Sequence, residues 1–313
     1  MTSHYTLDGA APLAHLGLIR AAGADAATFL HGQLTSDVAL LDTARARLAG
    51  YCSAKGRLLA SFIAWKTSPE EVQLLCSADV LPATLKRLSM FVLRAKCKLT
   101  DATAELQRMG LAGPSATAWL GDAAPAVVWG RTERDGATIV RLPDVAGAAR
   151  YLWVAPAGAA TPALPALDPA AWRWSEVQSG IASIETATVD QFVPQMLNYE
   201  LLGGVDFKKG CYPGQEIVAR SQYRGTIKRR TYLFAGAEPA APGQEIFHSA
   251  DPGQPAGMVV NAATLPGEGG GSSVLAEMKL AAMGDGTLHL GRADGPLLAA
   301  TPMPYEVTTE AAD

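Results

Sequence analysis

One short segment of the chain gathers residue types that can do chemistry. Residues 207–220 read Phe-Lys-Lys-Gly-Cys-Tyr-Pro-Gly-Gln-Glu-Ile-Val-Ala-Arg, so that Cys211 follows Lys208, Lys209 and a glycine. Pro213 suits the first position of a helix, which predicts Cys211 just outside a helix N-terminus. Helix N-termini and neighbouring cations both lower the pKa of a thiol. The sequence therefore predicts that Cys211 is a functional, catalytically competent thiol. The alternative is a small buried residue in a tight turn.

The other three cysteines, Cys52, Cys76 and Cys97, lie in apolar, strand-like surroundings, which favours an inert structural role. No two cysteines form a Cys-x-x-Cys pair, so the spacing predicts neither a disulfide framework nor a zinc site, and no metal site is expected. None of the five histidines lies in a recognisable partner motif of a cysteine protease or transferase. The sequence leaves open whether one of these histidines approaches Cys211 in space.

Basic residues also cluster around this segment. Residues 206–230 carry seven lysines and arginines against two acids, a local charge of +5 on a chain whose net charge is −4. Such a patch attracts a carboxylate tail, a phosphate or an RNA backbone, while the alternative is an ordinary solvated helix face. The predicted basic patch consists of Lys208, Arg220, Arg224, Lys228 and Arg229.

The composition indicates a folded protein of two or three modules. The chain has 313 residues, of which 49% are hydrophobic and 18% charged. No apolar run approaches the about 20 residues that cross a bilayer, and the first residues lack the features of a secretory signal. We therefore expect a cytoplasmic protein without a membrane partner.

The elements that must position Cys211 are read from turn and capping signals. Residues 23–32 predict a helix ended by Gly32, and Ala54-Lys55-Gly56 predicts a hairpin. Residues 72–99 read as β-α-β, with Asp79 as the helix cap, and strand-like segments follow over 103–155. The predicted domains are an N-terminal α+β region over 1–154, an Ala/Pro-rich connector over 155–168, a central helix and Cys211 segment over 169–227, and a C-terminal β-barrel of short strands over 228–313. The central helix follows Asp168-Pro169 and ends near Gly180.

The Cys211 segment resembles the signature of a known family. The matching residues are Lys209, Gly210, Cys211, Tyr212, Pro213, Gly214, Gln215 and Glu216, with the flanks Phe192-Val193-Pro194-Gln195, Asn198, Arg220, Tyr223-Arg224-Gly225 and Lys228-Arg229. A weaker likeness covers most of the chain, including residues 30–37. On these residues the chain resembles the YgfZ branch of the folate-binding aminomethyltransferase-like superfamily, which is related to the glycine-cleavage T protein.

The resemblance implies a fold and a function. The implied fold class is α+β, with ferredoxin-like split βαβ domains around a central folate-binding opening and a small C-terminal β-barrel. The implied role is tetrahydrofolate binding in iron–sulfur cluster assembly or repair, which supports tRNA modification by iron–sulfur enzymes. The implied partners are therefore a folate, iron–sulfur enzymes or assembly proteins and, indirectly, tRNA, with no permanently bound metal. The implied folate contacts are Trp172, by ring stacking, and Gln178, by a hydrogen bond.

Two departures from the T-protein pattern bear on catalysis. Ala60 and Ser61 stand where T proteins carry acidic residues, so no carboxylate is available there as a general acid or base. Gln178 stands where T proteins carry a pterin-binding Glu, which replaces a charge-assisted hydrogen bond by a neutral one. The sequence thus favours a binding protein over an enzyme. The alternatives are a folate-dependent aminomethyltransferase or demethylase, and direct tRNA recognition through the basic patch.

Overall fold

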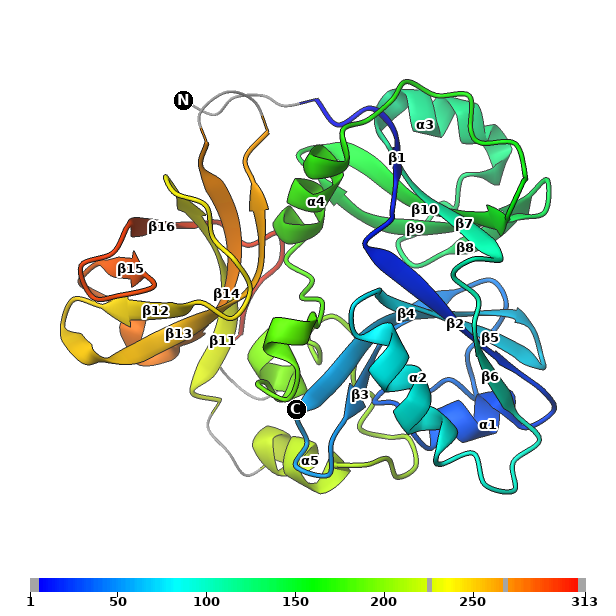
Figure 1. Ribbon diagram of the computed structural model, residues 1–313, viewed down its shortest axis with the longest axis horizontal. Coiled ribbons are helices and arrows are strands. Elements are labelled where there is room, and N and C mark those ends of the chain that lie inside the picture. The colour runs from blue at the N-terminus through cyan, green and yellow to red at the C-terminus, as the bar shows by residue number, and fades with distance from the viewer. Residues whose placement is uncertain (1–5, 224–226, 267–269, 309–313) are drawn as a thin grey trace.

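A computed structural model describes residues 6–223, 227–266 and 270–308 of the chain. Its strands form two five-stranded antiparallel sheets and one closed six-stranded barrel. Figure 1 shows the barrel on one side of the molecule and the two sheets on the other. The predicted α+β fold class with a C-terminal barrel is confirmed.

The first sheet packs against two helices, α1 and α2. The predicted hairpin is confirmed as β3 and β4, and α1 ends at Gly32 as expected. Phe29 and Leu30 of α1 and Leu88 of α2 pack into the core of this sheet. Its order is β3(Ala46–Cys52), β4(Leu58–Ser68), β5(Glu71–Ser77), β2(Leu16–Ala22), β6(Lys98–Asp101), and its helices are α1(Ala26–His31) and α2(Leu81–Ser89).

The second sheet includes the first strand of the chain, so the two sheets interleave in sequence. Residues 113–120 within it form a helix, where only strand-like segments were predicted. Gly113 and Ala116 are among the few buried residues of this helix, so its inner face is made of small residues and shows little helical periodicity. The order is β1(Gly9–Pro12), β7(Leu106–Ala112), β10(Ala148–Pro156), β9(Ala137–Val145), β8(Arg131–Arg134), with α3(Gly113–Leu120) and the short helix η1(Gly121–Ala123).

The barrel closes because β11 pairs with β14 on one side and with β16 on the other. Apolar residues alternate between the two faces of these strands, as small barrels require. Phe234 and Val274 pack in a core made of barrel residues, whereas Leu233 and Leu275 pack outward against apolar residues that include Val177. Residues 267–272 are rich in glycine, for which the sequence predicts a plain flexible loop, and they lie partly outside the described residues. The strands are β11(Arg229–Gly236), β14(Ser272–Lys279), β13(Asp251–Thr264), β12(Glu245–His248), β15(Leu288–Leu290) and β16(Leu297–Thr301), with the short helix η4(Leu280–Ala282) after β14.

Helix α4(Pro169–Gln178) lies between the barrel and the second sheet (Figure 1). The Asp168 carboxylate accepts a hydrogen bond from the backbone N–H of Ala170 at 2.8 Å, so the predicted cap is confirmed. After α4 the chain passes through η2(Thr186–Thr188) and η3(Pro194–Leu197) and reaches α5(Gln215–Tyr223).

Two helix starts differ from the prediction. Helix α5 begins at Gln215, two residues after Pro213, so Pro213 is not its first residue and Cys211 lies four residues before the helix, farther from the N-terminus than predicted. The glycine at position 214, with φ of 79°, explains the delay, because its left-handed backbone is not helical. Asp79 does not occupy the N-cap of α2, which is Val80; its carboxylate instead accepts from the backbone N–H of Thr186 at 2.8 Å.

The helices of the described ranges are all too short, or too polar, to span a bilayer.

Candidate functional site

A cavity of about 100 Å³ lies where the two sheets and α4 meet. Strand β4 supplies Ser61 and Phe62, strand β10 supplies Arg150, and α4 supplies Trp172 and Glu176. Most of the remaining lining residues are apolar. A concave apolar pocket with a few convergent polar groups is the usual form of a small-molecule site.

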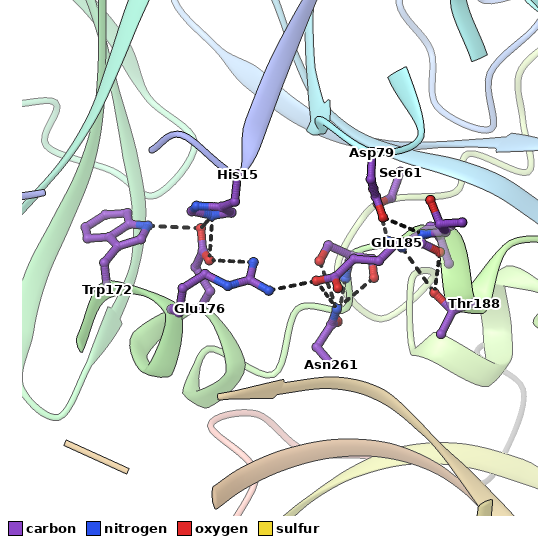
Figure 2. A network of polar contacts seen from close by, with 12 residues as sticks. His15, Ser61, Asp79, Trp172, Glu176, Glu185, Thr188 and Asn261 are labelled. Atoms are coloured by element: carbon purple, nitrogen blue, oxygen red, sulfur yellow. Dashed lines mark hydrogen bonds and ion pairs between the residues drawn. The ribbon is translucent and has the colours of Figure 1, made fainter. Parts of the chain in front are cut away.

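Glu176 is the carboxylate of this cavity. Its Oε1 accepts from Trp172 Nε1 at 2.9 Å, and His15 Nε2 lies 3.1 and 3.0 Å from its two oxygens. Arg173 Nη1 donates to Oε2 at 3.3 Å, and Figure 2 shows His15 and Trp172 converging on the carboxylate. Burial raises the pKa of Glu176, but the hydrogen bond and charge of His15 and the charges of Arg173 and Arg150 outweigh it, so the net shift is downward. The carboxylate is therefore held ionised, with 25% of its side-chain surface open.

Trp172 lines the cavity but is enclosed by protein, with only 1% of its surface exposed. The Arg150 guanidinium lies 4.7 Å from the ring centroid, and a Cβ at Gly110 would stand 2.4 Å from the ring. Gly110 is therefore required by the close approach of the tryptophan. The structure assigns the indole N–H to Glu176, and the predicted stacking of Trp172 on a ligand stays a prediction.

Gln178 points elsewhere. Its Nε2 donates to Ser273 Oγ at 2.6 Å, on strand β14 of the barrel. Two helical positions correspond to about 200° of rotation, so Gln178 and Glu176 face opposite sides of α4. Glu176, which was not predicted from the sequence, thus faces the cavity. Gln178, which was predicted to contact folate, instead joins α4 to the barrel. The spacing of Trp172 and Glu176 by four residues was the available signal.

A polar network continues from the cavity to the barrel. Arg173 Nη2 donates to Glu185 Oε1 at 2.8 Å, and Asn261 Nδ2 of β13 donates to the same oxygen at 3.2 Å (Figure 2). Ser61 Oγ accepts from the backbone N–H of Ile184 at 2.8 Å, and Ala60 is fully buried. Ala60 therefore packs in the core of the first sheet, Ser61 holds the backbone of Ile184, and neither position places an acid in the cavity.

The signature turn, defined as residues 209–216, exposes Cys211 between two buried neighbours. Lys209 is 8% exposed, and its Nζ donates to the carbonyl oxygens of His31 at 2.6 Å, Leu34 at 3.0 Å and Gly210 at 3.2 Å. Tyr212 is 6% exposed, and its ring centroid lies 4.7 Å from the same Nζ. Cys211 therefore projects from a backbone that its neighbours hold in place.

The back of the signature turn rests on the β3–β4 hairpin. A Cβ at Gly214 would lie 2.3 Å from the carbonyl oxygen of Ser53 and 2.7 Å from the backbone of Gly56, and both glycines have positive φ. Only glycine allows two backbones this close. The flanking signature residues Gln195 and Asn198 are also buried, and their amides donate to backbone carbonyls of α5 and β11.

The predicted basic patch divides into paired and exposed residues. Arg220 pairs with Glu216 at 3.0 Å on the surface of α5, and Arg229 pairs with Glu277 of β14. Lys208 and Lys228 are exposed, and Arg224 lies outside the described residues.

The four cysteines are all free. Burial raises the pKa of Cys52 and Cys76 to about 12, and of the four thiols only Cys211 is classed as exposed. Among the described residues, no three His, Cys, Asp or Glu side chains are grouped to hold a metal ion. The residues that line the central cavity in the described ranges include no member of the signature turn, so the structure separates Cys211 from Trp172 and Glu176.

Comparison with known proteins agrees with this architecture. Residues 9–133 match the GCVT N-terminal domain. The chain is 31% identical over 310 residues to the tRNA-modifying protein YgfZ of Sodalis glossinidius, covering 93% of this chain and 90% of that one. It is 32% identical over 238 residues to the YgfZ of Vibrio vulnificus strain YJ016, covering 74% and 71%. The crystal structure of aminomethyltransferase T of the Bartonella henselae glycine cleavage system superposes with a TM-score of 0.76 at 18% identity, covering 99% of this chain and 89% of that one, which shows a shared fold.

Proposed function

Because the chain belongs to the family of tRNA-modifying proteins YgfZ, we propose that it is a tetrahydrofolate-binding accessory protein of iron–sulfur cluster assembly or repair. Through that role it supports tRNA modification by iron–sulfur enzymes. The observation that carries the folate part is the ionised Glu176 at the wall of the central cavity.

The carboxylate and the apolar side chains of the cavity suit a pterin. One edge of a pterin ring presents neighbouring N–H groups, which a carboxylate accepts in a charge-assisted, two-point contact. Glu176 supplies the carboxylate, and the apolar walls near Phe62 and Leu152 suit the ring faces. The cavity of about 100 Å³ is smaller than the about 150 Å³ cavity that admits benzene in an engineered protein. Folate binding therefore requires movement of lining side chains, and the glutamate tail extends out of the cavity.

The state of Glu176 favours binding over catalysis. A general acid or base works best when its pKa lies near the working pH. The pKa of Glu176 is lowered by His15, Arg173 and Arg150 despite its burial, so the group is a weak base at neutral pH. With Ala60 and Ser61 at the positions of the T-protein acids, we put the aminomethyltransferase or demethylase alternative second.

Cys211 is the proposed contact with the client protein. A cluster usually needs four thiolates, so one exposed cysteine holds an iron–sulfur cluster only transiently and together with a partner. The basic patch is partly neutralised by Glu216 and Glu277, which supports an indirect rather than a direct relation to tRNA. Direct binding would show as tRNA affinity that falls steeply between low and moderate salt.

Calorimetric titration with tetrahydrofolate tests the folate site on the full chain. Wild type is expected to bind one equivalent, and Glu176→Gln should weaken affinity by about tenfold, the value of one charge-assisted contact. Tryptophan fluorescence of wild type and Trp172→Phe reports whether the ligand lies near that ring. Absence of binding by wild type, or unchanged affinity in Glu176→Gln, contradicts the proposed site.

A cell-based assay tests Cys211 separately. In cells that lack this protein, Cys211→Ala is expected to leave iron–sulfur-dependent tRNA modification unrestored while its melting temperature stays near that of wild type, because the side chain is exposed. A large loss of stability would instead support a structural role of the turn. The matched control is Cys97→Ala, which removes a half-buried thiol outside the signature turn and should restore modification.

A further inference from the structure

The signature turn meets a histidine that no motif connects to it. His31 is the last residue of α1 and lies 178 positions before Lys209 in the sequence. Its backbone carbonyl accepts the 2.6 Å hydrogen bond from Lys209 Nζ. The end of α1 and the start of the signature turn are thereby fastened to each other.

The imidazole of His31 is oriented by a carboxylate. Nδ1 lies 3.0 Å from Asp37 Oδ1, which also accepts from the backbone N–H of Leu40 at 2.9 Å. Asp37 accepts but cannot donate while ionised, so Nδ1 carries the proton and Nε2 presents its lone pair. Burial raises the pKa of Asp37, but the Leu40 hydrogen bond, the His31 contact and the charge of Arg47 together outweigh it. The net shift of the pKa is downward, so the carboxylate stays ionised.

The free nitrogen of His31 faces the signature turn. A Cβ built at Gly210 would lie 3.4 Å from His31 Nε2, and Cys211 is the next residue. The backbone of the signature turn thus lies within van der Waals reach of the ring at this nitrogen. Cys211 is exposed, and its charged form lies close enough to influence the Lys209 ammonium. In the described part of the chain no hydrogen bond joins the Cys211 thiol to the ring, as is common before substrate binds.

We infer that Cys211, His31 and Asp37 form a nucleophile, a general base and an orienting carboxylate, and that this site performs thiol–disulfide exchange with a disulfide of a partner molecule. In the step, the Cys211 thiol gives its proton to His31 Nε2 while its sulfur attacks one sulfur of the disulfide. A new S–S bond forms and the old one breaks. The departing sulfur takes the electron pair and then the proton from His31, so Cys211 is oxidised to a mixed disulfide and the partner half is reduced to a thiol.

The electrostatic surroundings of His31 come from several elements. Asp37 faces it from its own segment, Lys209 from the signature turn, and Lys66 of β4 and Arg47 of β3 act on Asp37. The charge of Asp206 also acts on Lys209. A histidine titrates near pH 6.5 and an ordinary thiol near pH 8.5, so base catalysis and direct thiolate attack separate on the pH axis.

Reaction with the small disulfide 4,4′-dithiodipyridine tests this inference, with the label located on the tryptic peptide of residues 210–220. The rate for wild type is expected to rise with an inflection below pH 7.5 and again above pH 8. At pH 7, His31→Gln should react at least about tenfold more slowly and lose the lower inflection. Asp37→Asn should retain an inflection displaced to lower pH with a several-fold slower rate. His289→Gln, on β15, is the matched control and should follow wild type.

Two results would overturn the inference. A wild-type profile with a single inflection above pH 8 excludes base catalysis without any variant, even if His31→Gln folds poorly. A His31→Gln rate within twofold of wild type across the range does the same for a folded variant. The assay needs neither folate nor a client enzyme. Its failure therefore leaves the proposed folate-binding function standing, and a failed folate titration leaves this inference standing.

Discussion

The central cavity and the signature turn use their polar groups in opposite ways. In the cavity, Glu176 turns inward, and its carboxylate is hydrogen-bonded to both His15 and Trp172. In the signature turn, the buried ammonium of Lys209 donates to backbone carbonyls, and the side chain of Cys211 faces solvent. The cavity thus places the Glu176 carboxylate in its lining, and the signature turn places the Cys211 thiol on the surface.

This difference matches two kinds of encounter. A small ring that enters a cavity gains most from a donor–acceptor set already fixed in place, because little ordering remains to be done. A thiol that must meet a macromolecule has to be exposed, and its precision comes from the backbone beneath it. Lys209 and Tyr212 supply that rigidity from buried positions. The signature turn therefore combines buried residues that fix the backbone with an exposed thiol, and substitutions should separate the two.

Replacement of Lys209 by methionine should give the largest loss of stability. The change keeps the length of the side chain but leaves three carbonyl oxygens without their charged donor, which costs about 3–4 kcal/mol of unfolding free energy. Urea unfolding measures it, and Cys211→Ser, which removes no buried contact, should stay within about 0.5 kcal/mol of wild type. Equal effects of the two variants would remove the distinction between the buried residues that fix the backbone and the exposed thiol.

Replacement of Glu176 by alanine should destabilise the protein less. It leaves the Trp172 indole N–H, His15 and Arg173 without their shared acceptor, but a quarter of the carboxylate surface is open. The expected loss lies between the values of exposed and fully buried ion pairs, at about 2–3 kcal/mol. The same urea unfolding series measures it. A loss below about 0.5 kcal/mol would mean that the network is not pre-formed, and the contrast with the signature turn would weaken.

The pH dependence of stability should distinguish the cavity from the rest of the molecule. The pKa of Glu176 in the folded chain is below its unfolded value of about 4.3, so its stabilising contribution is complete above about pH 5 and is lost as the pH falls through the folded pKa. Wild type should therefore lose stability more steeply below pH 5 than Glu176→Gln, which has no titrating group there. Urea midpoints at intervals from pH 6 to pH 3 give the two slopes. Parallel slopes would show that the partners of Glu176 do not lower its pKa.

Local signals in the sequence predicted most of the fold. Gly32 ended a helix, Asp168 with Pro169 started one, and Gly56 turned a hairpin, each by a backbone requirement within a few residues. Helix α3 was missed because glycine and alanine on its inner face carry no strong periodic signal. What local chemistry cannot encode is the direction of a side chain around a helix, which decided between Glu176 and Gln178.

Contacts between distant segments were also beyond the reach of the sequence. Cys211 was singled out by its neighbours, but the approach of His31 depends on the packing of α1 against the signature turn, 178 positions along the chain from Lys209. The glycines at positions 56 and 214 were visible as turn residues, whereas their need to touch each other was not. Long-range packing turns a list of candidate residues into a site.

Replacement of Gln178 by alanine should have the smallest effect on stability, and it tests directly which side of α4 binds folate. Its amide joins α4 to β14 through one hydrogen bond to Ser273, so the expected loss of stability is about 1 kcal/mol. Because Glu176 and not Gln178 lines the cavity, tetrahydrofolate affinity should change by less than twofold. Calorimetry on Gln178→Ala and Glu176→Gln in parallel measures this. If Gln178→Ala lost affinity tenfold and Glu176→Gln did not, the folate would have to bind on the barrel side of α4, and the family pattern would outrank the geometry described for the central cavity.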